Sequence, residues 1–271
     1  MTKLGKVSRQ QEHKPAFVAR VNMLGVGITP ANLGRALDTL EGWRVEGRHE
    51  YVCCVSVHGL VVSLKDPEFR CVLSRAGLTT QDGMPLVWWC RHVGFKDADR
   101  ACGRDLLTEV CAVSAKFNYR HYFYGGEQHV VERLVSNLTQ RFPGLTIVGH
   151  HSPPFRRLTA EEDAADVAAI NATRPDFVWV GLGTPKQDRW MAEHVGRIDA
   201  TALLGVGAAF DFVSGMKLQA PLWMQRWGLE WTFRLATEPR RLASRYLVGN
   251  SIFVLRAMQQ VLGLKSYVSN W

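Results

Sequence analysis

The feature that most constrains the fold of this chain is a regular alternation of short apolar runs with longer helical patterns. Each apolar run is rich in β-branched or aromatic residues and is bounded by Gly, Pro or Asp, as buried strands are. Strands that alternate with helices predict a parallel sheet covered on both faces. The expected fold class is therefore α/β, with a Rossmann-like parallel sheet flanked by helices. The predicted strands are residues 52–57, 121–125, 145–149, 176–183 and 201–207.

Helices are expected between and around these strands. One begins with Thr159-Ala160-Glu161-Glu162, a capping box in which the Thr hydroxyl and the Glu carboxylate each satisfy a free amide. After about residue 212 the pattern changes to two helical stretches, near 220–237 and 239–263, broken at Glu238-Pro239. The helices of the alternating part are predicted at residues 30–41, 67–76, 84–92, 104–117, 127–141, 159–173 and 186–196.

These patterns divide the chain into three parts: a flexible basic lead (1–20), a Rossmann-like domain (21–211) and a basic amphipathic helical C-terminal appendage (212–271). The appendage holds eight basic and two acidic residues, which is most of the net charge of +8. Trp223, Trp227 and Trp231 recur every fourth residue, which predicts that they share one helix face. Such a stripe fits a core seam, but a basic amphipathic segment with tryptophans is also typical of proteins that lie on an anionic bilayer.

The net charge favours an anionic partner, such as phosphate, a nucleotide, nucleic acid or an acidic membrane face. No apolar run reaches the roughly 18–20 residues that span a bilayer, so an integral membrane protein is not expected. The first 20 residues lack the apolar run of a signal peptide. The six cysteines form no CxxC pair, and we interpret them as reduced thiols of a cytoplasmic protein rather than as a zinc site.

Two glycine-containing turns follow predicted strands and open helices: Tyr124-Gly125-Gly126 and the GLGTPKQ segment at 181–187. In a parallel sheet, ligands bind beyond the carboxyl ends of the strands. Glycines there allow a ligand to approach the backbone, and free amides at a helix start favour phosphate. Lys186 and Gln187 could grip a phosphate and a base or sugar edge, whereas the paired glycines at 125–126 could simply turn the chain.

Acidic residues and a histidine at strand ends are further candidates. Asp82 lies at a predicted strand-to-helix corner, where a carboxylate serves either as a general base or as a helix cap. Asp211, after the last strand, has the same ambiguity. Asp97-Ala98-Asp99 is the DxD pair with which many sugar-nucleotide enzymes hold a divalent ion, but its basic flanks favour a solvated loop. His58 either lines a site or is a buried, hydrogen-bonded histidine.

Other functional classes find less support in the sequence. No GxGxxG segment is followed by an acidic residue about 20 positions on, which argues against a nicotinamide-dependent oxidoreductase. No Walker A sequence is present either. A basic nucleic-acid-binding protein is the other alternative. Basic residues interleaved with exposed aromatics along a groove, or a recognisable binding module, would support it, and neither is apparent.

A set of motifs follows one another in an order that is similar to a known enzyme family. The motifs are Gly25-Val26-Gly27, Gln81-Asp82-Gly83-Met84-Pro85, Gly103-Arg104-Asp105-Leu106, Tyr124-Gly125-Gly126, the segment 181–187, Ala208-Ala209-Phe210-Asp211-Phe212, Gly228-Leu229-Glu230-Trp231, Arg234-Leu235, Glu238-Pro239, Arg241-Leu242 and Arg245-Tyr246-Leu247. Over residues 21–250 the chain thereby resembles the WecG/TagA/CpsF family of bacterial glycosyltransferases.

The resemblance implies a Rossmann-like domain of the GT-E type with a helical appendage. It implies inverting transfer of a sugar from a UDP-sugar, with no required metal or other cofactor, to a polyprenyl-diphosphate-linked saccharide. It further implies a cytoplasmic protein, peripheral on the inner face of the membrane, with the appendage at an anionic membrane surface and no nucleic-acid partner. Such products feed cell-surface or exopolysaccharide biosynthesis. The sequence leaves open the sugar, the acceptor, the pathway and whether the chain forms a homo-oligomer.

The resemblance also implies roles for single residues. Asp82 stands at the position of the catalytic base, and three arginines of the appendage would neutralise the leaving diphosphate, since guanidinium binds phosphate oxygens bidentately. The Thr-x-Asn found near the sugar in the family is replaced by Cys54-Val55-Ser56, so the sugar could be N-acetylmannosamine, glucose or a related one. Two further departures are Asp188 for a Glu and Gln219 for an Arg. The expected substrate-binding residues are Cys54, Ser56, His58, Gly83, Asp105, Gly125, Gly126, Gly183, Pro185, Lys186, Gln187, Asp211, Arg234, Arg241 and Arg245.

Overall fold

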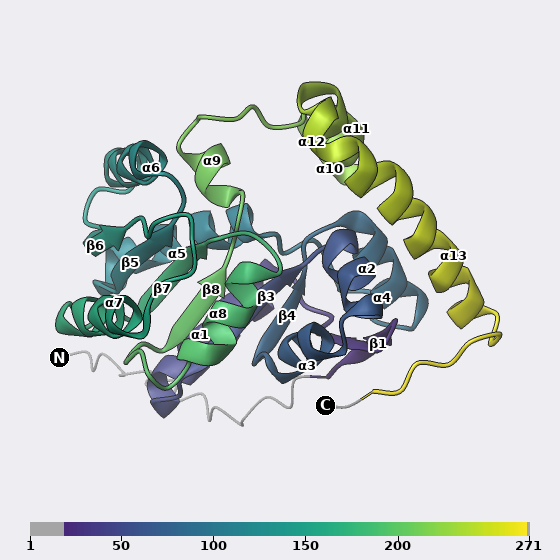
Figure 1. The fold of residues 1–271 in the computed structure, drawn as a ribbon, viewed down its shortest axis with the longest axis horizontal. Helices are drawn as coiled ribbons and strands as arrows, with labels where there is room; N and C mark the ends of the chain where they lie inside the picture. The colour runs from purple at the N-terminus through teal and green to yellow at the C-terminus, as the bar shows by residue number, and fades with distance from the viewer. Residues whose placement is uncertain (1–18, 270–271) are drawn as a thin grey trace, which may run out of the picture.

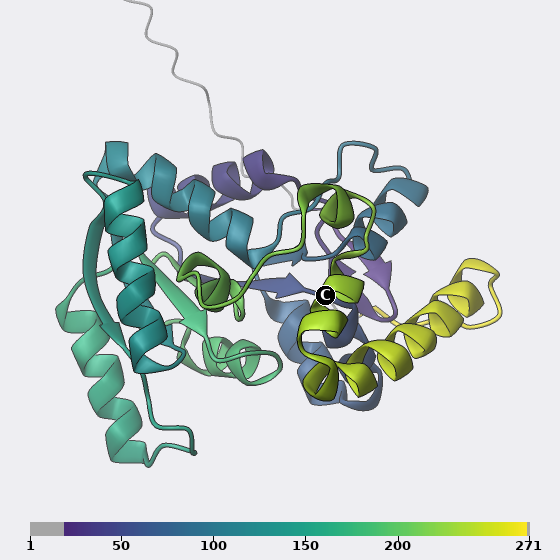
Figure 2. The same ribbon diagram turned by 90° about the horizontal axis from the view of Figure 1, so that it is seen from above.

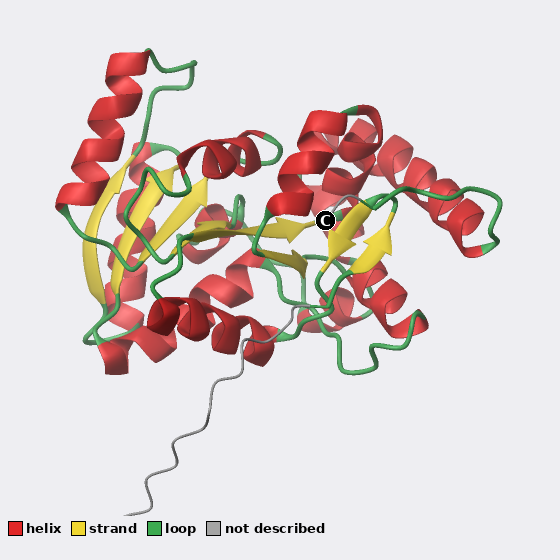
Figure 3. Cartoon of the chain, turned by 90° about the horizontal axis from the view of Figure 1, so that it is seen from below, coloured by secondary structure: helices red, strands yellow, loops and turns green. Residues whose placement is uncertain are grey.

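A six-stranded parallel sheet forms the centre of the computed structural model, which describes residues 19–269. The strand order is β4-β3-β8-β7-β5-β6, and every neighbouring pair runs parallel. Helices lie on both sides of this sheet (Figure 1, Figure 3). The Rossmann-like α/β class is therefore confirmed. The strands are β3 (Glu50–Val55), β4 (Leu78–Gln81), β5 (Arg120–Gly125), β6 (Thr146–His151), β7 (Phe177–Gly181) and β8 (Ala202–Gly205).

The helices that accompany the sheet agree with the sequence prediction to within a few residues, apart from α2. The Thr159 hydroxyl accepts a hydrogen bond from the Glu162 amide over 3.2 Å, and the Glu162 carboxylate accepts one from the Thr159 amide over 2.9 Å, so the capping box is confirmed. The helices are α1 (Leu33–Glu46), α2 (Val57–Lys65), α3 (Pro67–Arg75), α4 (Met84–His92), α5 (Gly103–Phe117), α6 (Gln128–Arg141), α7 (Ala160–Ala172) and α8 (Lys186–His194).

Successive strand residues alternate between two cores, one on each face of the sheet. Phe123 and Trp179 belong to the core that α1, α5 and α6 cover. Tyr124 and Val180 belong to the core that α2, α3 and α8 cover. Because both faces of the sheet are covered, β7 and β8 are apolar throughout, and β3, β5 and β6 each contain an apolar run, which is why these five strands were predicted from the sequence.

The edge strand β4 was implied by the predicted corner at Asp82 but is not among the predicted ranges, because three of its four residues are polar. Its polar side chains are buried, and most of their polar atoms are hydrogen-bonded, whereas the buried Gln81 amide oxygen has no partner within residues 19–269. The Thr80 hydroxyl donates to the Ala101 carbonyl over 2.7 Å, and the Gln81 amide nitrogen donates to the Thr29 carbonyl over 2.8 Å. Asp82 follows directly at the end of β4 and precedes α4, so the predicted strand-to-helix corner is confirmed.

A small antiparallel hairpin of β1 (Val21–Met23) and β2 (Val26–Ile28) precedes the main sheet. Just before it, the Arg20 guanidinium donates to the Ser74 carbonyl over 2.6 Å and anchors the start of the described chain to the end of α3. Residues 1–18 of the predicted flexible lead lie outside the described residues.

The C-terminal helices, α10 to α13, form an arm beside the sheet, and α13 runs along α2 (Figure 1). The prediction of one helix near 220–237 is wrong, because Gly228 takes a left-handed conformation (φ +71°) that ends α10 and separates it from α11. Trp223, Trp227 and Trp231 therefore do not share one helix face. The elements are α9 (Ala209–Val213), α10 (Leu222–Arg226), α11 (Glu230–Thr237), α12 (Pro239–Ala243), the π-helical turn η1 (Ser244–Val248) and α13 (Gly249–Val261). None of the helices in the described part of the chain is long and apolar enough to cross a membrane.

Candidate active site

A cleft of about 760 Å³ opens at the carboxyl ends of the central strands, where ligands of parallel sheets bind. The turns after the strands form one side of it, and α11, α12 and η1 form the other. Seven basic and four acidic side chains line the cleft, so its walls carry an excess of positive charge. The predicted site residues that line it are Cys54, Ser56, Asp82, Gly126, Gly183, Lys186, Gln187, Asp211, Arg234, Arg241 and Arg245.

The glycines of the two predicted turns have different tasks. At Gly183 (φ +76°), a Cβ atom would have no neighbour within 4 Å, so this backbone is open to the cleft. Gly126 also lines the cleft. A Cβ atom on Gly125 (φ +106°) would instead lie 2.9 Å from the carbonyl carbon of Gly181. Gly125 thus permits the close packing of β5 against β7 and is not among the residues that line the cleft.

The segment at the start of α8 presents one charged side chain and buries its neighbours. Lys186 is exposed at the cleft, with Nζ 5.5 Å from the ring centroid of Phe155. Gln187 is only 3% exposed, and its amide oxygen accepts a hydrogen bond from the Gly183 amide over 3.1 Å. Gln187 therefore stabilises the conformation of the loop that precedes α8. Pro185 caps α8 and does not line the cleft, and Asp188 is buried beneath the loop.

Asp82 lies at the end of β4, with its amide donating to the Val55 carbonyl over 2.9 Å. Burial, and next the nearby Glu230 carboxylate, raise the pKa of Asp82, while Arg100, Arg234 and the Gly103 amide act in the opposite direction. A carboxylate whose pKa is raised is a stronger proton acceptor than an exposed one. The position at the cleft and the raised pKa are what a general base needs.

Three arginines from the C-terminal helices converge on the cleft: Arg234 of α11, Arg241 of α12 and Arg245 of η1. Burial lowers the pKa of Arg245, and the neighbouring charges of Arg234 and Arg241 lower it further. Within residues 19–269, the buried Nε atoms of Arg234 and Arg245 have no hydrogen-bond partner. Buried donors without partners are costly, so this cluster is suited to an anion with several acceptor oxygens.

Three basic residues of the site, Arg100, Arg104 and Lys217, were not predicted. The Arg100 guanidinium donates to the Glu230 carboxylate over 2.6 Å and to the Gln225 amide oxygen over 2.7 Å. Arg104 donates to the Gln219 amide oxygen over 2.5 Å. The motif Gly103-Arg104-Asp105-Leu106 was a signal for Arg104, whereas the partners of Arg100 on the C-terminal helices lie more than 100 residues away and leave no local signal.

Asp105 and Asp211 take part in ion pairs at the site. Asp105 lies behind the cleft, where its carboxylate pairs with the guanidinium groups of Arg100 and Arg104. It is therefore not among the residues that line the cleft. Asp211 does line it, and its carboxylate lies 2.8 Å from Nζ of Lys217.

The DxD pair lies on an exposed loop away from the cleft. The Asp97 carboxylate is 4.0 Å from the Arg35 guanidinium, and the Asp99 carboxylate is 3.5 Å from that of Arg91. Neither aspartate lines the cleft. The interpretation of this sequence as a solvated loop is confirmed.

A second cavity, of about 740 Å³, meets the cleft at Asp82. Its walls are mainly apolar and come from α2, α4, the turn before α11, and α13. His58 and Gly83, which were predicted to bind substrate, line this cavity rather than the cleft. Burial, together with the nearby Arg245 charge, lowers the pKa of His58 to about 4, so its imidazole is neutral at pH 7.

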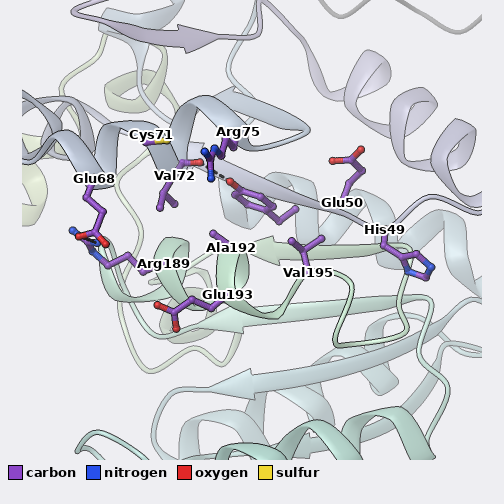
Figure 4. A pocket seen from close by; sticks show the side chains of 11 residues that line it. His49, Glu50, Glu68, Cys71, Val72, Arg75, Arg189, Ala192, Glu193 and Val195 are labelled. Carbon is purple, nitrogen blue, oxygen red and sulfur yellow. Dashed lines mark hydrogen bonds and ion pairs between the residues drawn. The ribbon is translucent and has the colours of Figure 1, made fainter. Parts of the chain in front are cut away.

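A further hollow of about 490 Å³ lies at the opposite end of β3, between α3 and α8 (Figure 4). Its prominent polar groups already have partners. The Arg189 guanidinium bonds Asp66 and Glu68 over 2.6 and 2.7 Å, and the Tyr51 hydroxyl donates to the Val72 carbonyl over 2.6 Å. This hollow therefore offers less to a ligand than the cleft does.

Comparison with known proteins points to the same family as the sequence motifs do. The model of the "Glycosyl transferase WecG/TagA/CpsF family" matches residues 21–267. Two curated relatives, from Bacillus spizizenii and Bacillus subtilis, are 30% and 28% identical over 66% and 78% of the chain, and 68% and 81% of their own lengths. A third, from Staphylococcus aureus, is 23% identical over 83% of the chain and 87% of its own length. Each is named N-acetylglucosaminyldiphosphoundecaprenol N-acetyl-beta-D-mannosaminyltransferase.

Proposed function

The chain belongs to the WecG/TagA/CpsF family of glycosyltransferases, and from that premise we propose that it transfers a sugar, with inversion, from a UDP-sugar to a polyprenyl-diphosphate-linked saccharide. Glycosyltransferase activity and an acceptor carried on a polyprenyl diphosphate follow from the family and its named members. The observation that supports the finer proposal is that the Asp82 carboxylate shares a junction with Arg234 and Arg245, whose buried Nε atoms have no hydrogen-bond partner in the described part of the chain.

In this mechanism Asp82 accepts the proton of the attacking acceptor hydroxyl. The hydroxyl oxygen forms a bond to the anomeric carbon as the bond from that carbon to the UDP oxygen breaks on the opposite face. The electron pair of the broken bond stays on the diphosphate of UDP, where Arg234, Arg241 and Arg245 stabilise the developing charge. Asp82 then returns its proton to water.

The donor would lie along the open backbone of the cleft. Gly126 and Gly183 leave room for the nucleotide to approach the main chain, and Lys186 supplies a charge at the start of α8. The arginines on the facing wall would then reach the diphosphate from the other side. Gln187 acts indirectly, by holding the loop that carries Gly183.

The residues at the end of β3 would contact the transferred sugar. The relatives' names specify N-acetylmannosamine, and we propose this sugar, glucose or a related one as the donor group for this chain. Burial, with the nearby Asp82 charge, raises the pKa of the Cys54 thiol to about 12, so it stays protonated and is a weak hydrogen-bond donor. The Ser56 hydroxyl caps α2 by accepting a hydrogen bond from the Gly59 amide over 3.5 Å and still faces the cleft.

We also propose that the protein is peripheral on the inner face of the cell membrane and feeds cell-surface or exopolysaccharide synthesis. In this view residues 21–211 form the catalytic domain and residues 212–271 the membrane-docking appendage. Large apolar side chains of the C-terminal helices are exposed, which is unusual for a surface that faces only water. Examples are Leu222, Trp223, Leu247, Val248, Leu255, Met258 and Leu262.

The test is turnover with a panel of UDP-sugars and a synthetic N-acetylglucosaminyl diphosphate lipid, with and without EDTA. We expect release of UDP with one or two donors, a product of inverted anomeric configuration by NMR, and the same rate in EDTA. NADH and single-stranded DNA serve as binding controls. A retained configuration, or turnover only with a nucleotide sugar other than a UDP-sugar, would contradict the proposal.

A further inference from the structure

We propose that the apolar groove beside Asp82 binds the first isoprenoid units of the acceptor's lipid chain, so that the enzyme recognises the lipid as well as the saccharide. The apolar groove is the second cavity described above, with Trp88, Trp227, Phe253, Val254 and Ala257 among its walls. This inference rests on the proposed function, and it assigns the acceptor a place that the reaction alone does not specify.

The groove has a polar end and an apolar end. At the junction with the cleft, Asp82, Arg234 and Arg245 line both cavities. Further along, the walls belong to α4 and to α13, which runs away from the site toward the edge of the molecule (Figure 2). A ligand that fits such a gradient has a polar head at Asp82 and an apolar chain that leads along α13.

The apolar walls are open rather than packed. Trp88 of α4 is 50% exposed, Trp227 is 73% exposed and Val254 of α13 is 53% exposed, although all three are apolar and line the same groove. They come from three separate elements, and Gly228 allows the ring of Trp88 to lie against the turn before α11, where a Cβ atom would be 2.8 Å from that ring. Apolar side chains that gather around one open groove mark a site for an apolar ligand.

The acceptor's own lipid is the occupant that these positions favour. If the acceptor hydroxyl reaches Asp82, the saccharide fills the junction, and its diphosphate extends from there away from the donor cleft. The chain that leaves this diphosphate then meets the apolar groove, whereas the cleft on the other side is polar and positively charged. The neutral imidazole of His58 adds no charge to the groove wall.

Binding of two synthetic acceptors, measured by calorimetry without vesicles, tests the proposal. One acceptor is N-acetylglucosaminyl diphosphate with a methyl ester, and the other carries a farnesyl chain. Because each buried methylene group strengthens binding about fourfold, burial of even part of the chain makes the farnesyl acceptor at least about tenfold tighter for the unmodified protein. Equal affinities, or binding of neither acceptor, would overturn the proposal.

Variants separate the groove from a general attraction to lipid. Val254→Asp should abolish the farnesyl advantage, because it places a carboxylate in the groove wall. Leu255→Asp is the matched control: Leu255 is next to Val254, is 55% exposed, and does not line the groove. If both variants lost the same share of the farnesyl advantage, α13 would attract apolar chains along its whole exposed surface, and the groove would be refuted.

A variant on the opposite wall makes the test independent of α13. Trp88 is half exposed on α4, so Trp88→Gln is expected to fold, and it should lose at least half of the farnesyl advantage. Transfer assays distinguish this proposal from the proposed function. Transfer with equal KM for both acceptors would refute the groove and keep the reaction. Tighter binding of the farnesyl acceptor without transfer from any UDP-sugar would support the groove and refute the proposed reaction.

Discussion

The guanidinium of Arg100 donates a 2.6 Å hydrogen bond to the carboxylate of Glu230, which lies 130 residues further along the chain. The same guanidinium donates to Gln225, so one side chain from the loop before α5 fixes both α10 and α11 against the sheet domain. Asp82 lies beside this contact, because both Arg100 and Glu230 act on its pKa. The base and the arginine cluster therefore owe their relative positions to this ion pair.

Replacement of Arg100 tests that dependence. We expect Arg100→Met to lower the free energy of unfolding by about 1.5–3 kcal/mol, the range for hydrogen bonds to charged groups, and to lower kcat at least tenfold because α11 shifts. Urea denaturation and initial rates measure the two effects. Arg35→Met is the control, since its exposed 4.0 Å pair with Asp97 should contribute under about 0.5 kcal/mol. Equal stability of the two variants would show that Arg100 does not hold the helices.

Asp82→Asn tests the assignment of the base. We expect kcat to fall by about 10²–10⁴-fold, the usual contribution of general base catalysis. The folded-state pKa of Asp82 lies above its unfolded value, so its ionisation costs stability as pH rises through the folded pKa. The Asn variant should therefore melt at the same or a higher temperature at pH 7. Normal turnover by a folded Asn variant would remove Asp82 from the mechanism.

The fold was largely predictable because helices cover both faces of the sheet, which gives each of the strands β3, β5, β6, β7 and β8 an apolar run. The helices between them carry clear start signals, such as the capping box at Thr159. The prediction failed where a buried strand is polar and where an apolar helix directly follows an apolar strand. β4 is polar and is held by side-chain hydrogen bonds of Thr79, Thr80 and the Gln81 amide nitrogen, and α2 follows β3 so closely that its apolar residues extend the strand pattern.

The candidate site was predictable wherever it depends on topology. Parallel strands end at one edge of the sheet, so Asp82, Gly126 and Gly183 were expected together, and the structure brings them to one cleft. Contacts between distant segments have no such signal. The pairing of Arg100 with Glu230 depends on how the C-terminal helices dock, and the helix break at Gly228 sets that docking. The helix face predicted to be shared by Trp223, Trp227 and Trp231 is lost for the same reason.

The pH dependence of the reaction should report the pKa of Asp82. Activity should rise with pH as Asp82 loses its proton, and Glu230→Gln should move this limb of kcat/KM to lower pH, because the Glu230 charge raises the pKa of Asp82. Glu127→Gln, at an exposed carboxylate that lines the cleft, should leave the limb in place. An unchanged profile in the Glu230 variant would mean that another group sets the limb.

Arg245 and Arg240 form a matched pair for the anion site. Arg245 lines the cleft with an unpartnered Nε atom, whereas Arg240 is exposed and lies outside it. We expect Arg245→Met to lower kcat by about 10²–10³-fold, as loss of one preorganised donor does, and to weaken UDP binding at least tenfold. Arg240→Met should change neither quantity. Calorimetry with UDP and initial rates provide the comparison, and equal UDP affinity in both variants would place the diphosphate elsewhere.

Gly125 and Gly183 have positive φ angles and different surroundings, so the same substitution separates backbone strain from packing. Gly183→Ala adds a Cβ atom to open space and should cost only the strain of a left-handed backbone, about 1–2 kcal/mol. Gly125→Ala adds a comparable strain and a 2.9 Å contact with the Gly181 backbone, which no rotamer can relieve. Gly125→Ala should therefore lower the free energy of unfolding clearly more than Gly183→Ala, as urea denaturation would measure.

The effect on the substrate should be larger for Gly183→Ala. This substitution narrows the cleft and should raise KM for the UDP-sugar while the protein stays folded. If Gly183→Ala left KM unchanged, the nucleotide would not approach this turn, and the donor position proposed above would be wrong.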